Sequence, residues 1–425
     1  MKNSNDMSSG IIESTYALTQ AQLQKILKLM QFVGGSTSTK SLIKKMVPAL
    51  QEIVPCGKAI IWIYSAKKEK LWTLVGKSRF EVSQAKCIAG RTIKAGHHIN
   101  LSNPEQDASY LEKTDSMPGA KTGHILCFPM KTKANKVVGV LQIMNTVVHP
   151  ITPTVVNLIS EWSRIAAGLF TSTLKNDEIK NAFDSFVDTI SHALDTRDYI
   201  LAGHSRRVTL YAMELAKQMG LTTAEKEILQ YAGLLHDIGK IGIPELILLK
   251  DKRPTGDEFQ LFKRHATLTR ELLSKVQFPE RLNGIVEIAA THHERVNGTG
   301  YPDGLSSEQI PRGGKILAVC DVFDALTSRR PYADRLPIKE VVEILDAETG
   351  ETFEPFSVYH FKNITLDRVI QIIEYGHTEA IDKKDLKYLS GFALNDLVNL
   401  DKFKSDDQQR VETTFMRYYS RIYRG

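Results

Sequence analysis

The sequence predicts a multidomain protein in which an α+β domain precedes an all-α domain. The chain has 425 residues, enough for two or three domains that each bury a core. Between residues 59 and 144, short segments rich in β-branched and aromatic residues predict strands, and helical segments flank them. From residue 152 onward the apolar residues recur at helical spacing, which predicts helices for the rest of the chain.

Composition limits the class of protein. Hydrophobic residues make up 42% of the chain and charged residues 24%, values typical of a soluble globular protein. The net charge of +6 is small for this length and does not indicate DNA binding. The four cysteines form no CxxC pair, which fits a reducing cytoplasm. The polar start MKNSNDMSSG lacks a signal-peptide core, and no run of about 18 apolar residues predicts a membrane span.

The first domain is predicted from alternating helical and strand patterns. Apolar residues at helical spacing predict one helix that begins near residue 20 and a second over residues 39–53. Strands are predicted over residues 59–64, 71–75, 124–130 and 137–144, with another beginning near residue 98. Residues 87–96 contain glycines that we expect to close turns. A helix over residues 152–174 ends this domain.

A long helical pattern links the two domains. Apolar residues continue at helical spacing through residue 194, and the polar stretch TSTLKNDEIKN divides them. We interpret residues 173–194 as a linker or signalling helix. A dimeric coiled coil and helices packed on their own domains remain equal alternatives, because no heptad pattern persists for three or four repeats.

Sequence signals also mark the helices of the second domain. Thr222 with Glu225, and Thr255 with Glu258, form capping boxes at the starts of two helices. The loop VNGTGYPDG separates two further helices and is rich in glycine. The basic aromatic end FMRYYSRIYR is predicted to pack on the body of the protein, with nucleic acid or membrane contact as the less favoured alternative.

The stretch YAGLLHDIGKIG, residues 231–242, carries the first chemical signal. Ile228, Ala232 and His236 lie four residues apart, so a helix would place them on one buried face. A buried histidine next to the carboxylate of Asp237 needs a partner, because burying an unpaired charge is costly. On this stretch alone, a metal ion and a hydrogen-bonded core pair are equally good explanations.

More candidate ligands follow in the same domain. The full set consists of His204, His236, Asp237, His265, His292, His293 and Asp321. Nitrogen and carboxylate donors without thiolate suit iron, manganese or zinc. The set is too large for one tetrahedral ion, whereas two ions that share a bridging carboxylate would use it. Such metal pairs act on phosphate esters.

The second domain resembles the HD-GYP phosphodiesterases. The matching segments, within residues 181–362, are GHSRRV, HDIGKIGIPELIL, HHERVNGTGYPDGL, KILAVCDVFDALTSRRPY and GETFEPFSVYHF. The resemblance implies hydrolysis of cyclic di-GMP to linear pGpG, with GMP as an open further product, by two divalent ions, iron or manganese. One ion would use His204, His236, Asp237 and Asp321. The other would use Asp237, His265, His292 and His293, with Asp237 bridging.

The resemblance also implies roles for residues that do not bind metal. Lys240, together with Asp237, is expected to be catalytic, by stabilising charge or donating a proton. Tyr301 and Pro302 would shape the substrate pocket. Arg330 would bind a substrate phosphate. Asp324, which we group with these substrate-binding residues, would orient other groups of the site.

Two positions depart from the family pattern. Members with three metals carry a glutamate where this chain has Ile200, so we predict two ions. The basic residue that usually follows RRPY is Ala333 here, which would weaken substrate binding unless Arg329 or Arg335 substitutes.

The first domain resembles GAF domains, which sense small molecules. The resemblance covers residues 22–172 and rests on the order of elements around IAGRTIKAGHHINLSNPEQD and VVGVLQIMN. The NKxnFx3DE-type signature of some cyclic-nucleotide-binding GAF domains is absent, so its ligand stays open. His97, His98 and His124 are candidate contacts, although surface or core histidines are the favoured interpretation.

These resemblances define the domain boundaries that we predict. They are 1–21 for a polar N-terminal segment, 22–172 for the GAF-like sensor domain, 173–194 for the linker, 195–362 for the HD-GYP domain and 363–425 for a C-terminal helical extension. The leading hypothesis is a cytoplasmic, GAF-regulated cyclic di-GMP phosphodiesterase that could form a homodimer. The alternatives are a catalytically weak cyclic di-GMP receptor that signals through partner proteins, and a hydrolase of another cyclic dinucleotide.

Overall fold

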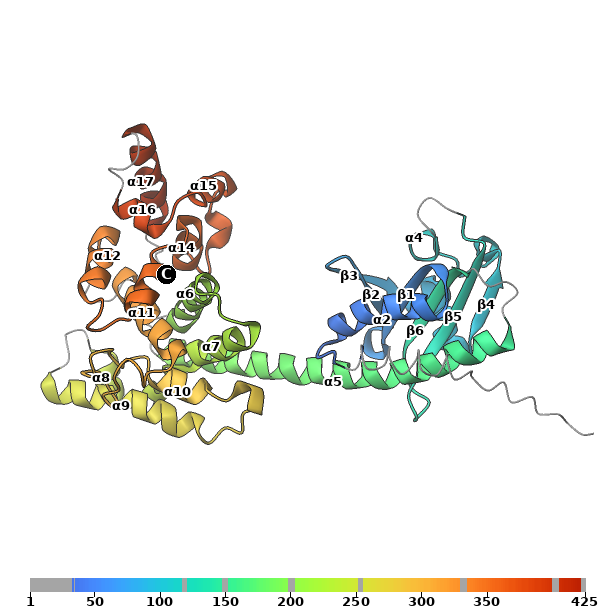
Figure 1. The fold of residues 1–425 in the computed structure, drawn as a ribbon, viewed down its shortest axis with the longest axis horizontal. Coiled ribbons are helices and arrows are strands. Elements are labelled where there is room, and N and C mark those ends of the chain that lie inside the picture. The colour runs from blue at the N-terminus through green and yellow to red at the C-terminus, as the bar shows by residue number, and fades with distance from the viewer. Residues whose placement is uncertain are drawn as a thin grey trace, which may run out of the picture. The chain divides into compact units, whose positions relative to one another are not determined.

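The computed structural model contains two compact units, residues 1–182 and residues 183–425 (Figure 1). It describes residues 33, 35–116, 121–146, 152–197, 203–250, 255–328, 335–399 and 405–421. The first unit is α+β and the second is helical, as the sequence predicts. The finer domain boundaries given above stay predictions.

The first unit is built on a six-stranded sheet with the order β3-β2-β1-β6-β5-β4. Its neighbouring strands are antiparallel. The strands are β1 (Cys56–Ser65), β2 (Lys70–Val75), β3 (Ser78–Ser83), β4 (Ile99–Ser102), β5 (His124–Lys131) and β6 (Val137–Thr146). All the predicted strands are confirmed. The strand β3 (SRFEVS) was not predicted, because its alternating pattern contains only two apolar residues, Phe80 and Val82.

Helices cover both faces of this sheet. Helix α2 (Thr39–Ile53) and the first half of α5 (Pro153–Arg197) pack in one hydrophobic cluster with the sheet. Helix α3 (Ile88–Ala95) packs in a second cluster, on the other side of the alternating strand residues. Short elements η1 (Ala66–Lys68), η2 (Gln84–Lys86), η3 (Pro104–Gln106) and α4 (Glu112–Asp115) connect these parts. Most of the helix predicted from residue 20 lies outside the described residues.

The turns predicted over residues 87–96 are wrong, because α3 occupies most of this stretch. Its glycines serve other purposes. A Cβ on Gly90 would lie 1.8 Å from the Gln84 carbonyl oxygen, so glycine is needed for close backbone packing. Gly96 ends the helix with a φ of +69°, in the left-handed region that favours glycine.

Helix α5 contributes to both units. Ile159, Trp162 and Phe170 belong to the core of the first unit, whereas Val187 belongs to the core of the second. The polar stretch TSTLKNDEIKN continues the helix, as expected for a linker that is itself helical. The 45 residues of α5 therefore form one element that both cores share.

The second unit contains only helices among the elements assigned to the described residues (Figure 1). They are α6 (His204–Gln218), α7 (Thr223–Leu235), η5 (Ile238–Gly242), α8 (Glu245–Leu248), α9 (Gly256–Leu273), η6 (Glu280–Leu282), α10 (Ile285–Ala290), α11 (Arg312–Thr327), α12 (Ile338–Ala347), α13 (Pro355–Phe361), α14 (Leu366–Ile373), η7 (Thr378–Ala380), α15 (Lys383–Leu389), α16 (Leu394–Val398) and α17 (Ser405–Tyr419). Both predicted capping boxes, at the starts of α7 and α9, are confirmed.

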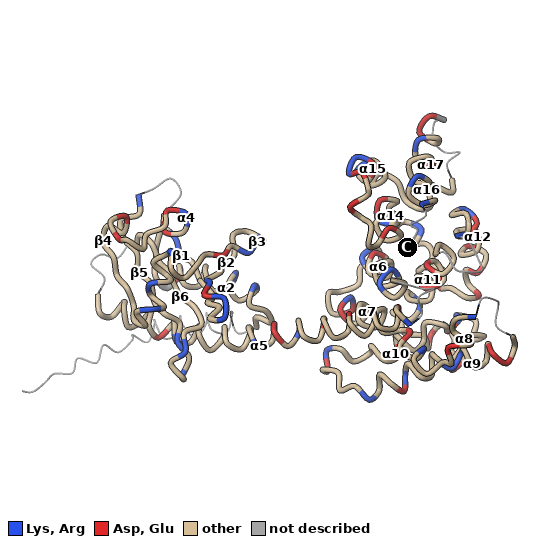
Figure 2. The backbone as a smooth tube through the Cα atoms, turned by 180° about the vertical axis from the view of Figure 1, so that it is seen from behind, with Lys and Arg blue, Asp and Glu red and all other residues tan. Residues whose placement is uncertain are grey.

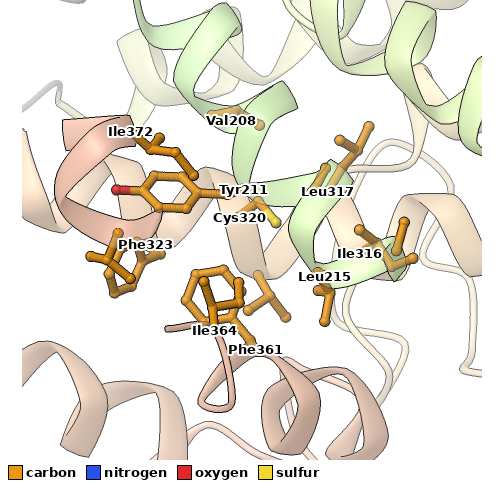
Figure 3. Packing of buried hydrophobic residues seen from close by; sticks show 14 of the residues in the cluster. Val208, Tyr211, Leu215, Ile316, Leu317, Cys320, Phe323, Phe361, Ile364 and Ile372 are labelled. Carbon is orange, nitrogen blue, oxygen red and sulfur yellow. The ribbon is translucent and has the colours of Figure 1, made fainter. Parts of the chain in front are cut away.

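Helix α11 lies at the centre of this unit. Its buried Leu317 and Phe323 pack with Tyr211 of α6 and Phe361 of α13 (Figure 3). The ring of Phe323 lies 5.1 Å from that of Tyr211 and 4.8 Å from that of Phe361, measured between ring centroids. Because α11 also carries Asp321, the packing that fixes the helix fixes a candidate ligand as well.

The C-terminal aromatic residues pack onto the body of the second unit, as predicted. Phe415 and Tyr418 of α17 are buried members of its hydrophobic core. Basic and acidic residues are interspersed along both units (Figure 2). None of the helices in the described residues is long and apolar enough to span a membrane.

Gly139 of β6 offers a test of packing in the first unit. A Cβ there would lie 2.1 Å from the Trp62 carbonyl oxygen of β1, so Gly139→Ala should destabilise this unit by about 1–3 kcal/mol. All three tryptophans, Trp62, Trp72 and Trp162, lie in the first unit, so urea unfolding followed by tryptophan fluorescence reports it selectively. Gly168→Ala is the control, because open space surrounds that position and stability should stay equal or rise. Equal midpoints for both variants would contradict this account.

Candidate metal centre

The seven candidate ligands come together in the second unit, although they are far apart in sequence. His204 begins α6, Asp321 lies in α11, and His265 lies in α9. The pair His236 and Asp237 joins α7 to η5, and His292 and His293 follow α10. Most of the ligands therefore lie at helix ends, where the backbone direction changes and side chains from several helices can meet.

Three of these histidines are oriented by the carbonyl of the residue three positions earlier. The Nδ1 atom of His236 lies 2.8 Å from Gly233 O, that of His265 2.7 Å from Phe262 O, and that of His292 2.7 Å from Ala289 O. A carbonyl only accepts, so Nδ1 must carry the proton and donate it. The Nε2 atom of each ring is then left with a lone pair, as a metal ligand requires.

These Nε2 atoms converge on one carboxylate. From the oxygens of Asp237, the Nε2 atoms of His236, His265 and His292 lie 3.3, 3.5 and 3.9 Å away, respectively. All three Nε2 atoms are buried, and none makes a hydrogen bond to any residue in the described part of the chain. Buried polar atoms without partners are costly, and the lone pairs of the neutral His265 and His292 rings add repulsion where they face the carboxylate. A cation among them would remove both penalties, so the donor set fits a metal site.

Asp321 is the second carboxylate near these histidines. Its Oδ1 atom lies 3.0 Å from His204 Nε2 and 3.8 Å from His236 Nε2, and its Oδ2 atom lies 3.9 Å from His293 Nδ1. Three groups have donor atoms within 4.8 Å of one another: His265, His292 and His293; His204, His236 and Asp321; and His236, Asp237 and His292. The third group shares His292 with the first group and His236 with the second. Asp237, which belongs to the third group, therefore links the first two. The arrangement therefore has room for more than one cation.

Charge in the cluster is divided between neutral rings and ionised carboxylates. Burial lowers the pKa of His265, and burial together with neighbouring histidines lowers the pKa of His292 to about 3. Burial opposes ionisation of Asp237, but the Lys240 and His236 cations outweigh it and hold the pKa well below its usual range. Neutral imidazoles beside an ionised carboxylate are the protonation states that bind metal.

His236 is the exception. Burial lowers its pKa, but the carboxylates of Asp237 and Asp321 outweigh that effect and raise it to about 10. Without a cation, a proton on His236 would thus balance part of the carboxylate charge. A metal that uses this ring must displace that proton.

His204 is oriented by a second carboxylate, Asp324. The His204 Nδ1 atom lies 2.8 Å from Asp324 Oδ2, and Arg207 donates hydrogen bonds of 2.7 and 2.9 Å to the two Asp324 oxygens. Asp324 is 1% exposed, and Arg207 holds its pKa at about 2 against the effect of burial. With both oxygens engaged in the interior, Asp324 is suited to orienting His204 and not to touching a substrate directly.

Lys240 lies at the edge of the cluster. Its Nζ atom forms an ion pair of 2.7 Å with Asp237 Oδ2 and lies 5.8 Å from the centroid of the Phe262 ring. The lysine is buried, so its charge acts on Asp237 with little screening by water.

Tyr301 lies beside the candidate ligands. Its backbone N–H donates to the His293 carbonyl over 3.2 Å, and its ring centroid lies 4.7 Å from that of His293. Pro302 follows it and is half-buried. Arg330, Ala333 and Ile200 lie outside the described residues. Arg335 donates a hydrogen bond of 2.7 Å to the Tyr419 carbonyl, so its guanidinium contacts α17.

Sequence reasoning missed several residues that shape the site. Thr269 donates to the His236 carbonyl over 2.9 Å and accepts from the Gly239 N–H over 3.0 Å. Glu294 is buried and accepts hydrogen bonds from the backbone of Asp303 and Leu305, which fixes the loop that carries Tyr301. A glutamate directly between the histidine pair and a glycine-rich loop was a usable signal in the sequence, whereas Thr269 stands in an ordinary helical pattern.

The candidate histidines of the first unit lie in that unit's sheet region. His97 and His98 are exposed, whereas His124 is buried and its Nε2 atom lies 2.6 Å from Asn100 Oδ1. No group of candidate metal donors occurs in the first unit within the described residues.

Part of the helical unit is similar to known proteins. Residues 188–356 match the HD domain family. A cyclic di-GMP phosphodiesterase from Thermotoga maritima is 42% identical over 165 residues, which cover 39% of this chain and 45% of that protein. The cyclic di-GMP phosphodiesterase response regulator RpfG from Xanthomonas campestris is 38% identical, over 42% of this chain and 47% of that protein. A 3′3′-cGAMP-specific phosphodiesterase from Vibrio cholerae is 36% identical, over 42% of this chain and 34% of that protein. The chain thus spans less than half the length of these curated relatives.

Solved structures match each unit at low sequence identity. The GAF domain of an Acinetobacter phosphoenolpyruvate-protein phosphotransferase is 14% identical, with a TM-score of 0.32. The match covers 38% of this chain and 99% of the GAF domain chain. An HDG"Y"P protein from Bdellovibrio bacteriovorus is 14% identical, with a TM-score of 0.33. The match covers 62% of this chain and 98% of the Bdellovibrio chain.

Removal of Asp324 tests the support of His204. Asp324→Ala breaks a buried ion pair with Arg207 and should destabilise the second unit by about 3–5 kcal/mol. Asp188→Ala is the matched control, because it breaks the exposed pair with Arg206 and should cost about 0–1 kcal/mol. The measurement is urea unfolding by far-ultraviolet circular dichroism, in the transition that tryptophan fluorescence does not detect. Equal costs for the two variants would contradict the assignment of Asp324 as a buried support.

Proposed function

We propose, on the premise that residues 188–356 form an HD domain of the HD-GYP family, that the protein is a metal-dependent cyclic di-GMP phosphodiesterase. The observation that carries this proposal is the set of buried histidine Nε2 atoms, without hydrogen-bond partners in the described residues, around Asp237. Two of the matched relatives are phosphodiesterases of cyclic di-GMP, and residues 188–356, which match the HD domain family, contain this cluster. The expected product is linear pGpG, with GMP as an open further product.

Two divalent ions, iron or manganese, would be held by the seven ligands. One would use His204, His236, Asp237 and Asp321, and the other Asp237, His265, His292 and His293. Asp237 is suited to bridge them, because its Oδ2 atom faces His204 and His236 while its Oδ1 atom faces His265 and His292. When bound, the ions would neutralise the phosphodiester charge and acidify the attacking water.

The protein's own groups would orient the reaction. Lys240 holds Asp237 in place through its ion pair of 2.7 Å and, as a buried ammonium, can stabilise charge or give a proton to the leaving oxygen. Tyr301 and Pro302 would form a wall of the nucleotide pocket, because the Tyr301 ring lies beside that of His293. Arg330 would contact a phosphate. Asp324 would keep His204 in the required tautomer.

We further propose that the first unit is a GAF-like sensor that regulates this activity in response to a small molecule. Helix α5 supports this, because it is part of both hydrophobic cores and ends beside η5. The ligand stays open, and the sequence departs from the cyclic-nucleotide signature of some GAF domains.

Two alternatives differ in substrate or in output. Another cyclic dinucleotide is a competing substrate, because relatives of similar identity are 3′3′-cGAMP-specific phosphodiesterases. The second alternative is a receptor that binds cyclic di-GMP without turnover. It is considered because Ala333 stands where a basic residue usually follows RRPY. The complete ligand set favours an enzyme over a receptor.

The decisive assay compares wild type with Asp237→Ala. Purified protein is incubated without oxygen with cyclic di-GMP and Mn(II) or Fe(II), and the products are separated by chromatography. Wild type should give pGpG. Asp237→Ala should lose both metal and activity, because it removes the carboxylate that faces the histidine Nε2 atoms. Full turnover by the variant would refute the site.

Other outcomes of this assay separate the alternatives. Binding of cyclic di-GMP without product would favour the receptor, and cleavage of 3′3′-cGAMP alone would favour the other substrate. Asp188→Ala serves as the active control, because Asp188 pairs with Arg206 on the surface, away from the candidate ligands.

Deletion of residues 1–172 tests the regulatory proposal. The shortened chain keeps the α5 residues that pack in the second unit, including Phe183 and Val187, so the helical unit should fold and bind two metal ions per chain. Its activity should differ from that of the full chain, because the sensor is gone. Metal content is measured by atomic emission and turnover by the same chromatography. A folded but metal-free shortened protein would contradict the assignment of all ligands to the second unit.

A further inference from the structure

The last turn of α5 makes an unusual set of contacts. The guanidinium of Arg197, the final residue of the helix, donates to three backbone carbonyls of η5 and the residue after it. Its Nη1 atom lies 2.9 Å from Lys240 O and 2.6 Å from Ile241 O, and its Nη2 atom lies 2.9 Å from Ile243 O. One side chain thus joins α5 to the element that carries Lys240 and follows Asp237.

These carbonyls need a cationic donor. The last C=O groups of a helical segment lack partners within the segment and carry partial negative charge. Of the three carbonyls that Arg197 reaches, that of Lys240 also accepts from the N–H of Ile243, over 3.0 Å. The planar fork of arginine can reach several acceptors at once, which a lysine ammonium does with less directional precision.

Helix α9 also fixes η5. Thr269 bonds both the Gly239 N–H and the His236 carbonyl. A Cβ on Gly239 would lie 1.9 Å from the His265 carbonyl oxygen, so η5 and α9 touch through their backbones. Segment η5 is therefore held by both α9 and Arg197, and loss of Arg197 would remove one of these two supports.

Asp195, in the same turn of α5, holds the other part of the site. Its carboxylate accepts from the Gly203 N–H over 3.0 Å and from the Ser205 hydroxyl over 3.3 Å. These residues flank His204. Gly203 caps α6 without a side-chain bond of its own, so Asp195 supplies the anion that a helix N-terminus favours.

We infer that the last turn of α5 sets the position of Asp237 and Lys240 relative to His204, with Arg197 as the positioning residue for η5. The His204 Nε2 atom lies 3.7 Å from Asp237 Oδ2, and a small cavity is lined by both residues together with Asp195, Arg197 and Lys240. This inference rests on the metal site of the proposed function. It also specifies the route of regulation, because α5 begins in the core of the first unit and ends on this contact.

The test measures Mn(II) binding to the full chain, without a substrate. Electron paramagnetic resonance gives both the free Mn(II) concentration and the spectrum of the bound ion. Arg197→Ala should weaken Mn(II) affinity on the order of tenfold and alter the spectrum, because groups that orient metal ligands typically contribute that much. Arg197→Lys keeps the charge with a poorer fork and should recover part of the loss.

Arg206→Ala is the matched control. Arg206 also links α5 to α6, through an ion pair of 2.8 Å with Asp188, but it does not contact η5. It should bind Mn(II) with wild-type affinity. Unchanged affinity and spectrum in Arg197→Ala would overturn the inference. If Arg197→Ala does not fold, Arg197→Lys decides, and wild-type binding in that variant would overturn it as well.

Turnover separates this inference from the proposed function. Wild type that binds Mn(II) but cleaves no cyclic di-GMP would refute the proposed function, while weaker binding by Arg197→Ala would still support the positioning role. Wild type that binds no Mn(II) would refute both. Where wild type is active, Arg197→Ala should lower kcat at saturating Mn(II) more than it changes KM, because η5 carries Lys240 and no assigned substrate contact.

Discussion

The helical unit is organised around one buried carboxylate, that of Asp237. Ionised and 6% exposed, it would be costly without compensating partners, and the surrounding residues supply them in two forms. Lys240 gives a charge at 2.7 Å, and histidine rings present Nε2 atoms that are ready for a cation. The position of η5, the ends of the neighbouring helices and the choice of tautomers all serve this arrangement.

Backbone atoms do much of the orienting. The carbonyls of Gly233, Phe262 and Ala289 each fix a ring through its Nδ1 atom, so ring geometry follows from helix geometry. Glycines allow the helices to approach closely enough. At Gly233 a Cβ would lie 2.7 Å from Thr209 Oγ1, and at Gly239 it would meet the backbone of α9. The site therefore depends on small residues that contribute no chemistry of their own.

The sequence alone predicted the α+β and helical units because their patterns are local. The apolar runs rich in β-branched residues in β1 and β6, and the capping box of Thr222 and Glu225, each extend over a few residues. The candidate ligands were found because histidines and aspartates are conspicuous in a helical sequence and occur in motifs. Helix α3 was missed, since its glycines resemble turn signals until the contact between Gly90 and Gln84 is known. Arg207 and Arg197 were missed for a related reason: their partners, Asp324 and the carbonyls of η5, are distant in sequence, and an arginine near a histidine has no distinctive spacing.

All seven donor residues lie between positions 204 and 321 of a single chain, within one compact unit. Each chain therefore carries all seven candidate ligands. Under the proposed function, an assembly that mixes intact chains with chains lacking Asp237 would keep the centres of its intact chains. A substitution at Asp237 would then remove activity only from the chain that carries it.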